Sequence, residues 1–309
     1  MAMNPETSTP SKAPRLSVGP CQYFWQKDSV ERFYAEISGS PVDIVYLGET
    51  VCAKRRALRP EDWIALGREL AAAGKEVVLS TFTVIEARSE MGVVRRFCEN
   101  GEFMVEANDV AAVRILRELG LPFATGPSMN IYNGATLRHY HRLGLRRWVL
   151  PVELGREALK GIRAEAKLAD VETEVFAYGH LPLAWSARCF AARYHDRPKD
   201  QCNLLCLDYP TGLPVNTREG DRFLNLNGIQ VQSGLICDLL PVWRDVVDAG
   251  ADILRLSPMP QGTLESIHAL RRAILGDGAA LASRCERPGP ICNGYWYAEP
   301  GMVRARLAK

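Results

Sequence analysis

The stretch Asp43-Ile44-Val45-Tyr46-Leu47-Gly48 decides how the chain folds. It is a short, nearly continuous apolar run that ends at a glycine, which is typical of a strand covered on both faces in a parallel sheet. Apolar side chains at helical spacing over residues 30–37 predict a helix before this strand, and a second helix is predicted over residues 60–73. The strand is therefore expected to lie between two helices that pack on the sheet.

The same alternation of a short apolar run and an amphipathic helix recurs along the chain. Eight such runs are predicted as strands, and they are centred near Leu16, Ile44, Val77, Met104, Phe123, Val149, Val175 and Leu254. Eight strand–helix units predict an α/β fold of the TIM-like (β/α)8 barrel type. An open, doubly wound sheet is the alternative that fits the same alternation.

The chain of 309 residues is long enough for one large α/β domain. Polar and proline-containing residues 1–14 predict a disordered tail, and residues 15–309 predict a single barrel-like domain. The regular spacing breaks once, where an insertion is predicted at about residues 178–235, between the seventh and eighth strands. Alternating apolar side chains over residues 222–233 predict a β-hairpin there, with its turn at Asn227-Gly228.

The charges of the chain almost cancel, since Lys and Arg total 38 against 36 for Asp and Glu, a net charge of +2. This balance argues against a surface built to bind nucleic acid or acidic lipid. No apolar stretch is long enough for a transmembrane segment, and the first residues lack the apolar core of a secretory leader. The composition predicts a cytoplasmic protein with no nucleic-acid partner.

Nine cysteines in such a chain indicate that some thiols do chemistry, because a reducing compartment does not maintain structural disulfides. Three of them, Cys189, Cys202 and Cys206, lie in the predicted insertion with the spacing C-x12-C-x3-C. Cys52 follows the second predicted strand, and in a barrel this loop and the insertion open onto the same face. The four cysteines are therefore predicted to form a thiolate metal site.

Four thiolates suit either zinc or an iron–sulfur cluster. Structural zinc sites usually contain a C-x2-C pair, which this sequence lacks, so the spacing favours a cluster. The alternative is that the thiols are only small buried side chains. That interpretation is preferred for the other five, which are Cys21, Cys98, Cys237, Cys285 and Cys292.

Four segments resemble the collagenase-like, U-type peptidase family. They are YLGETVCAKRR at residues 46–56, YGHLPLAWSARC at 178–189, RPKDQCNLLC at 197–206 and CNGYW at 292–296. Together they are similar to the members of this family that act in oxygen-independent ubiquinone biosynthesis. The resemblance extends from about residue 16 to residue 296, and the motifs occur in the family's order.

The resemblance implies a four-iron, four-sulfur (4Fe-4S) cluster held by the cysteines that match the family's motifs, which are Cys52, Cys189, Cys202 and Cys206. It also implies a heterodimer with a homologous partner of the UbiU type, and a lipid-binding helper of the UbiT type. Such a system hydroxylates the ring of a ubiquinone precursor without molecular oxygen. A complete set of cysteine ligands leaves no open iron position, which favours electron transfer or structural support by the cluster.

Two other classes of function are compatible with the sequence. The first is a peptidase of the U-type family, although the chain contains neither H-E-x-x-H nor G-x-S-x-G. The second is a non-catalytic scaffold stabilised by zinc. Metal analysis distinguishes the scaffold from the cluster protein.

Two groups of polar residues are weaker candidates for the site. Tyr178 and His180 are predicted to follow the seventh strand, where barrel enzymes place catalytic groups. The charged run Glu49, Lys54, Arg55 and Arg56 follows the second strand, where it is suited to an anionic cosubstrate or a carboxylate on the ring precursor. Further pocket candidates occur at or near strand ends, namely Glu106, Asn108, Asn130, Glu153 and Arg255.

Overall fold

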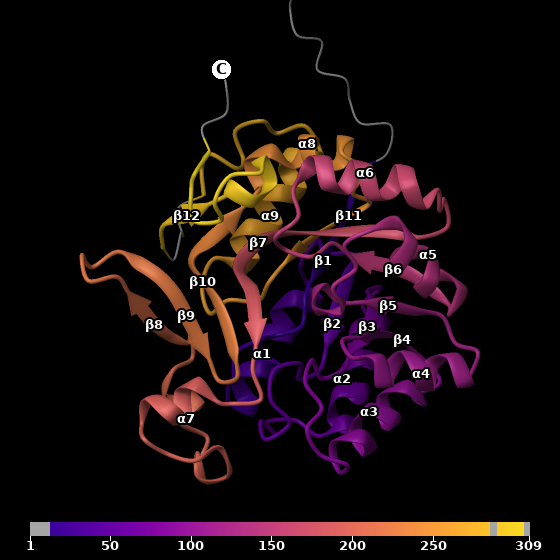
Figure 1. Ribbon diagram of the computed structural model, residues 1–309. Coiled ribbons are helices and arrows are strands. Elements are labelled where there is room, and N and C mark those ends of the chain that lie inside the picture. The colour runs from indigo at the N-terminus through magenta and orange to yellow at the C-terminus, as the bar shows by residue number, and fades with distance from the viewer. Residues whose placement is uncertain (1–12, 285–288, 306–309) are drawn as a thin grey trace, which may run out of the picture.

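A closed parallel barrel forms the centre of the molecule (Figure 1). The computed structural model describes residues 13–284 and 289–305. The strands β1 to β7 pair in chain order, and β11 completes the ring because it pairs with both β7 and β1. The predicted TIM-like barrel is confirmed, and the open sheet is wrong because this ring of strands has no free edge.

The eight predicted strands are all present. They are β1 (Arg15–Val18), β2 (Ile44–Leu47), β3 (Glu76–Ser80), β4 (Met104–Ala107), β5 (Phe123–Thr125), β6 (Leu145–Val149), β7 (Glu172–Trp185) and β11 (Ile253–Leu256). The remaining strands are β8 (Leu213–Asn216), β9 (Arg222–Asn227), β10 (Gln230–Asp238) and β12 (Ile291–Cys292). Strand β7 continues to Trp185, so the first residues of the predicted insertion extend a barrel strand instead of leaving it.

Helices surround the barrel between its strands. They are α1 (Lys27–Ser38), α2 (Pro60–Ala72), α3 (Glu90–Cys98), α4 (Val110–Glu118), α5 (Gly134–Arg142), α6 (Arg156–Ala166), α7 (Phe190–Tyr194), α8 (Trp243–Asp248) and α9 (Thr263–Ile274). Short 3-10 turns are η1 (Pro127–Met129), η2 (Lys199–Gln201), η3 (Leu205–Asp208), η4 (Leu240–Val242) and η5 (Gly294–Tyr297). Over the described ranges, every helix is too short or too polar to cross a bilayer. The predicted tail lies outside the described residues except for residues 13 and 14.

Gly48 turns the chain where β2 ends. Its φ of +128° is a conformation that side chains rarely adopt, and a Cβ atom there would lie 2.5 Å from the carbonyl oxygen of Ser80. Only glycine therefore lets β2 end this close to β3. The turn directs residues 49–56, which carry Cys52, across this end of the barrel.

Buried charges fill much of the barrel interior. Arg255 lies between two buried carboxylates, with its Nη2 atom 2.8 Å from Glu106 Oε1 and its Nε atom 2.7 Å from Glu174 Oε1. Nearer the start of the strands, the buried Arg147 pairs with Glu76 at 2.6 Å and with Glu172 at 2.8 Å. Because buried charges are costly unless paired, each of these arginines depends on carboxylates supplied by other strands.

An antiparallel extension leaves the barrel between β7 and β11. Its strands run in the order β7, β10, β9, β8, and the predicted hairpin of β9 and β10 is present. In Figure 1 the arrow of β7 points toward α7, so the segment that carries α7 lies at the carboxyl end of the barrel strands. This is the end at which barrel enzymes place their sites.

Candidate functional site

The loop that carries Cys52 contacts the segment that carries the other three candidate cysteines. Lys54 Nζ donates a hydrogen bond to the carbonyl oxygen of Lys199 at 2.8 Å, and Arg55 Nη2 donates to Asn227 Oδ1 at 2.8 Å. Residues 49–56 and residues 186–229 therefore lie side by side at one end of the barrel, as the topology predicted.

The described cysteines separate into two groups by burial. Cys21, Cys98, Cys237 and Cys292 are free thiols in the core, as predicted, and Cys285 lies outside the described residues. The four candidate ligands are all half-buried free thiols, namely Cys52, Cys189, Cys202 and Cys206. The thiols that are accessible to a metal are thus the ones on the loops at the carboxyl end of the barrel.

Local turns position the three cysteines of the extension. Cys189 precedes α7, and its Sγ atom accepts a hydrogen bond from the backbone N–H of Ala192 at 3.5 Å. Between Cys202 and Cys206 the chain reverses through Asn203 and Leu204, whose φ values of 47° and 56° are both left-handed. A leucine in this conformation is uncommon, and such strain concentrates where function requires a particular backbone path.

Arg55 lies at the centre of this region. Its buried guanidinium donates hydrogen bonds to the carbonyl oxygen of Gln22 and to Asn227, and it lies 3.9 Å from Glu49. Burial lowers the pKa of Arg55, but Glu49, Cys206 and Cys52 raise it, and the net result is a raised pKa. Its Nε atom has no hydrogen-bond partner among the described residues. A permanent positive charge with a free donor therefore sits beside two of the candidate ligands.

Burial favours the protonated form of two of the four candidate thiols, Cys52 and Cys206. It raises the pKa of Cys52 to about 11, and Arg55 and Lys199 oppose this shift. Burial also raises the pKa of Cys206, with Arg55 again acting in the opposite direction and Cys189 reinforcing the rise. A metal that binds these sulfurs must displace their protons, so its affinity is expected to increase with pH.

The residue types and their location fit a thiolate metal centre, but the side chains are not arranged in a complete coordination geometry. Among residues 13–284 and 289–305, no group of three or more Cys, His, Asp or Glu side chains is close enough to hold a metal ion. The gathering of the four sulfurs around one metal centre therefore stays a prediction. The soft sulfur donors suit an iron–sulfur cluster, and the positive charge of Arg55 beside Cys52 and Cys206 would stabilise an anionic one.

Tyr178 and His180 do not follow the seventh strand, contrary to the prediction, because β7 extends past both. Tyr178 is buried in the core, and its ring lies 5.4 Å from the guanidinium carbon of Arg284. His180 Nδ1 lies 2.7 Å from the carbonyl oxygen of Ser233 on β10, and burial lowers the pKa of His180. The His180 side chain thus bonds β7 to β10, whereas the Tyr178 ring packs against Arg284. A catalytic role for either residue stays a prediction.

The strand-end candidates divide between the barrel interior and the surface. Glu106, Asn108 and Arg255 are buried and line a small cavity of about 20 Å³ at the barrel mouth, which is room for one water molecule. Asn130 and Glu153 are exposed, and neither lines this cavity. The barrel mouth is thus filled by the protein's own ion pairs.

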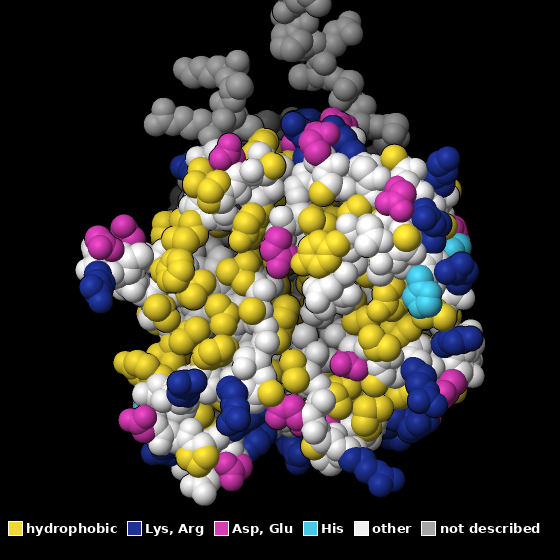
Figure 2. All heavy atoms as spheres, viewed as in Figure 1, with side chains coloured by type: hydrophobic (Ala, Val, Ile, Leu, Met, Phe, Trp, Pro, Cys, Tyr) yellow, Lys and Arg dark blue, Asp and Glu magenta, His cyan; other side chains and the backbone are white. Residues whose placement is uncertain are grey.

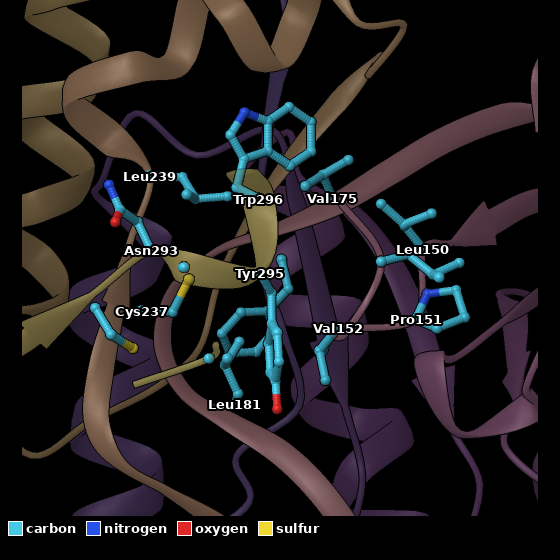
Figure 3. Close-up of a pocket in the computed structure, with 15 residues that line it drawn as sticks. Leu150, Pro151, Val152, Val175, Leu181, Cys237, Leu239, Asn293, Tyr295 and Trp296 are labelled. Atoms are coloured by element: carbon cyan, nitrogen blue, oxygen red, sulfur yellow. The ribbon is translucent and has the colours of Figure 1, made fainter. Parts of the chain in front are cut away.

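The late motif at residues 292–296 closes a second small cavity (Figure 3). Tyr295 and Trp296 project from η5 toward side chains of β7, including Val175 and Leu181, and the space left between them is also only about 20 Å³. Trp296 Nε1 donates to Asp245 Oδ2 at 2.7 Å. The motif therefore has a packing role in this structure.

Sequence reasoning missed the two amides that hold Arg55. Asn227 Nδ2 donates to the carbonyl oxygen of Gln22 at 2.7 Å, although the two residues are 205 positions apart. Neither stands in a motif that signals such a contact. Only the folded barrel brings the first strand–helix loop under the extension.

The model of peptidase family U32 matches residues 29–257 of the chain. The chain belongs to peptidase family U32. A solved structure with a similar fold is a rubisco-like protein from Alicyclobacillus acidocaldarius, with a TM-score of 0.50 and 15% identity over 91% of this chain and 69% of that chain. At this identity the likeness shows the barrel fold alone.

Curated relatives of this U32 chain match shorter segments. The tRNA hydroxylation protein P of Escherichia coli (strain K12) is 29% identical over 113 residues, or 35% of this chain and 24% of that protein. An uncharacterized protease of Methanocaldococcus jannaschii is 31% identical over 125 residues, or 39% of this chain and 30% of that protein. The matched segments span less than a third of the length of either relative.

Proposed function

We propose that this U32 chain is the iron–sulfur subunit of an oxygen-independent ring hydroxylase. The observation that carries the proposal is that the cysteines divide into two groups by burial. The half-buried thiols lie on contacting loops around Arg55, while the other described thiols are in the core. Thiols kept accessible beside a fixed positive charge suit an anionic thiolate cluster better than they suit packing.

Cys52, Cys189, Cys202 and Cys206 would hold the cluster, which we propose to be 4Fe-4S. Such a group supplies one-electron transfer, and four protein sulfurs leave no iron position open for substrate. Arg55 contributes a buried positive charge on one side of this set. Lys199, whose Nζ pairs with Glu86, and Lys54 add positive charge where the two loops meet. These cations would favour an anionic cluster and limit the protons it takes up.

The hydroxylation role rests on likeness. The Escherichia coli relative is named for tRNA hydroxylation, which favours the same broad chemistry here. The sequence motifs favour the UbiV-type members of the family and hence the ring of a ubiquinone precursor as substrate. The net charge of +2 also argues against RNA as the substrate of this chain. A UbiT-type helper would deliver the hydrophobic precursor.

The experiment that tests the proposal is metal analysis of the chain purified without oxygen. We expect about four irons and four acid-labile sulfides per chain, with broad visible absorbance near about 400 nm that air or dithionite bleaches. About one zinc per chain without labile sulfide would instead identify the zinc-stabilised scaffold and would contradict the proposal.

We also propose that a homologous subunit of the UbiU type covers the outer face of the extension. Hydrophobic side chains gather over β8, β9 and β10 in Figure 2. The cross-strand pairs Val215–Leu224 and Leu226–Val231 lie on this face, whereas the alternating amides of β9 and β10 bond to Gln22 on the opposite face. A sheet with its apolar face outward favours a protein partner.

The partner is expected to co-purify with the tagged chain from anaerobically grown cells, and Leu224→Glu is expected to remove it. Val110→Glu, which changes an exposed valine on α4, is the matched control and should retain the partner. Co-purification that survives Leu224→Glu would place the interface elsewhere on the molecule.

A further inference from the structure

A cavity of about 250 Å³ lies beside the loop that carries Cys52. Its walls come from residues 49–60, from the loop after β3 and from α2 and α3, which lie side by side in Figure 1. Large apolar side chains line it, including Trp63 of α2, Phe82 and Phe97 of α3. It is much roomier than the barrel mouth and the cavity under Trp296, which each measure about 20 Å³.

The size and walls of this cavity suit a ring. A cavity of about 150 Å³ lined by apolar side chains is enough to bind benzene. The cavity beside Cys52 is larger, so it accommodates a ring together with a substituent. Aromatic side chains such as Trp63, Phe82 and Phe97 pack favourably on the faces and edges of such a ring.

The charged side chains on the walls indicate which chemical group the ring of a ligand would carry. Three arginines line the cavity, and two of them already have partners within the protein. Arg55 bonds Gln22, Asn227 and Glu49, and Arg59 pairs with Asp62 at 3.3 Å.

Arg56 differs from both of these arginines. It forms no ion pair in the described part of the chain, and its one hydrogen bond is a long 3.5 Å contact with the carbonyl oxygen of Ala53. The acidic residue on the wall, Glu49, is compensated, since it accepts the backbone N–H groups of Val51 and Cys52 and faces Arg55. Arg56 is therefore the charge that is available to a ligand.

We propose that this cavity binds a ligand with one six-membered ring and a carboxylate, with the ring between Trp63, Phe82 and Phe97 and the carboxylate on Arg56. The planar guanidinium of one arginine matches a carboxylate through two parallel hydrogen bonds. The ring replaces water on the apolar walls, and the charged group stays at the mouth, where Arg56 is exposed. The adjacent arginines of the sequence thus have different roles, Arg55 inside the protein and Arg56 toward a ligand.

The test uses benzoate as a probe of the full-length chain purified without oxygen, followed by ligand-detected nuclear magnetic resonance titration. Benzoate is expected to bind, and acetate and benzyl alcohol are each expected to bind at least about tenfold more weakly, because each lacks one of the two recognised groups. Equal binding of benzyl alcohol and benzoate would contradict the role of Arg56.

Two variants locate the site. Arg56→Ala is expected to weaken benzoate binding about tenfold or more, whereas Arg218→Ala, an exposed arginine near the β8–β9 turn, should leave it unchanged. Val93→Trp adds an indole to the wall from α3 and is expected to block benzoate. Unchanged affinity in Arg56→Ala would overturn the proposal even if Val93→Trp does not fold.

Iron content measured on the same samples separates this inference from the proposed function. A chain that holds iron but does not bind benzoate contradicts the ring site alone. A chain that binds benzoate in the Arg56-dependent manner but holds no iron contradicts the cluster alone.

Discussion

Cys202→Ala is expected to abolish the visible absorbance of the anaerobically purified chain and to remove most of its iron. Cys202 lies at the end of η2, directly before the left-handed turn that leads to Cys206. In the proposed cluster, removing one thiolate would leave an iron without its protein ligand and would open the cluster to water and oxygen. Iron and sulfide analysis, together with the visible spectrum, measures the loss, and circular dichroism checks that the barrel is folded.

Cys98→Ala is the matched control for this change. Cys98 is a fully buried thiol at the end of α3, among apolar side chains of the core. Its replacement is expected to lower the stability slightly and to leave the iron content intact. Iron that persists in Cys202→Ala, or that is lost equally in Cys98→Ala, would contradict the proposed ligand set.

Cys52→Ala distinguishes a four-cysteine site from one built by the extension alone. Cys52 comes from the loop after β2, while the other three cysteines come from residues 186–229. We expect the same loss of iron as in Cys202→Ala. Retained iron in Cys52→Ala would mean that the fourth ligand lies outside this loop.

Much of the fold can be predicted from the sequence because the barrel strands are buried on both faces. Such strands appear as short apolar runs, and each of the eight predicted runs is a barrel strand. Helix α3 is less evident from the sequence, because Glu90, Gly92, Arg95 and Arg96 interrupt its apolar face. The end of β7 was missed because Gly179 and Pro182 resemble a loop, although β10 pairs with the strand around them.

The site is less predictable, because its organisation depends on contacts between distant segments. The spacing of the cysteines and the barrel topology were enough to indicate which thiols lie near one end. The different environments of Arg55 and Arg56 have no local signal, since Gln22 and Asn227 bury one arginine and leave its neighbour exposed. The extension of β7 likewise converted Tyr178 and His180 from strand-end candidates into sheet residues.

Arg255→Met is expected to lower the free energy of unfolding by about 3–5 kcal/mol at pH 7. The change leaves the buried carboxylates of Glu106 and Glu174 without the guanidinium that lies 2.8 and 2.7 Å from them. Methionine fills similar space but carries no charge, so the loss measures the uncompensated carboxylates. Urea unfolding followed by circular dichroism measures it. Arg114→Met, which breaks an exposed ion pair on α4, is expected to leave the stability essentially unchanged.

The pH dependence of the stability that is lost in Arg255→Met (the deficit) identifies the cause of the loss. Burial alone would raise the pKa of Glu174. Arg255, Arg147 and Ser17 lower the pKa by more than burial raises it, so the pKa of Glu174 lies below the usual range. In the wild-type chain this carboxylate therefore stabilises the fold above its unfolded pKa of about 4.3, and that contribution is lost as the pH falls. Without Arg255, burial is expected to raise the pKa of Glu174 above the unfolded value, so stability is lost as the pH rises.

The difference in stability between Arg255→Met and the wild-type chain, measured at each pH, should consequently shrink between pH 7 and pH 5. Adding Glu174→Gln to Arg255→Met removes one of the two uncompensated buried carboxylates. The double variant should therefore recover part of the lost free energy of unfolding at pH 7. A deficit that is the same at both pH values, and unaffected by Glu174→Gln, would mean that Arg255 stabilises the barrel mainly through packing, for example against the ring of Tyr46 at 4.1 Å. In that case the pairing of the buried charges would contribute little to the free energy of unfolding, and the packing of the Arg255 side chain would contribute most of the effect.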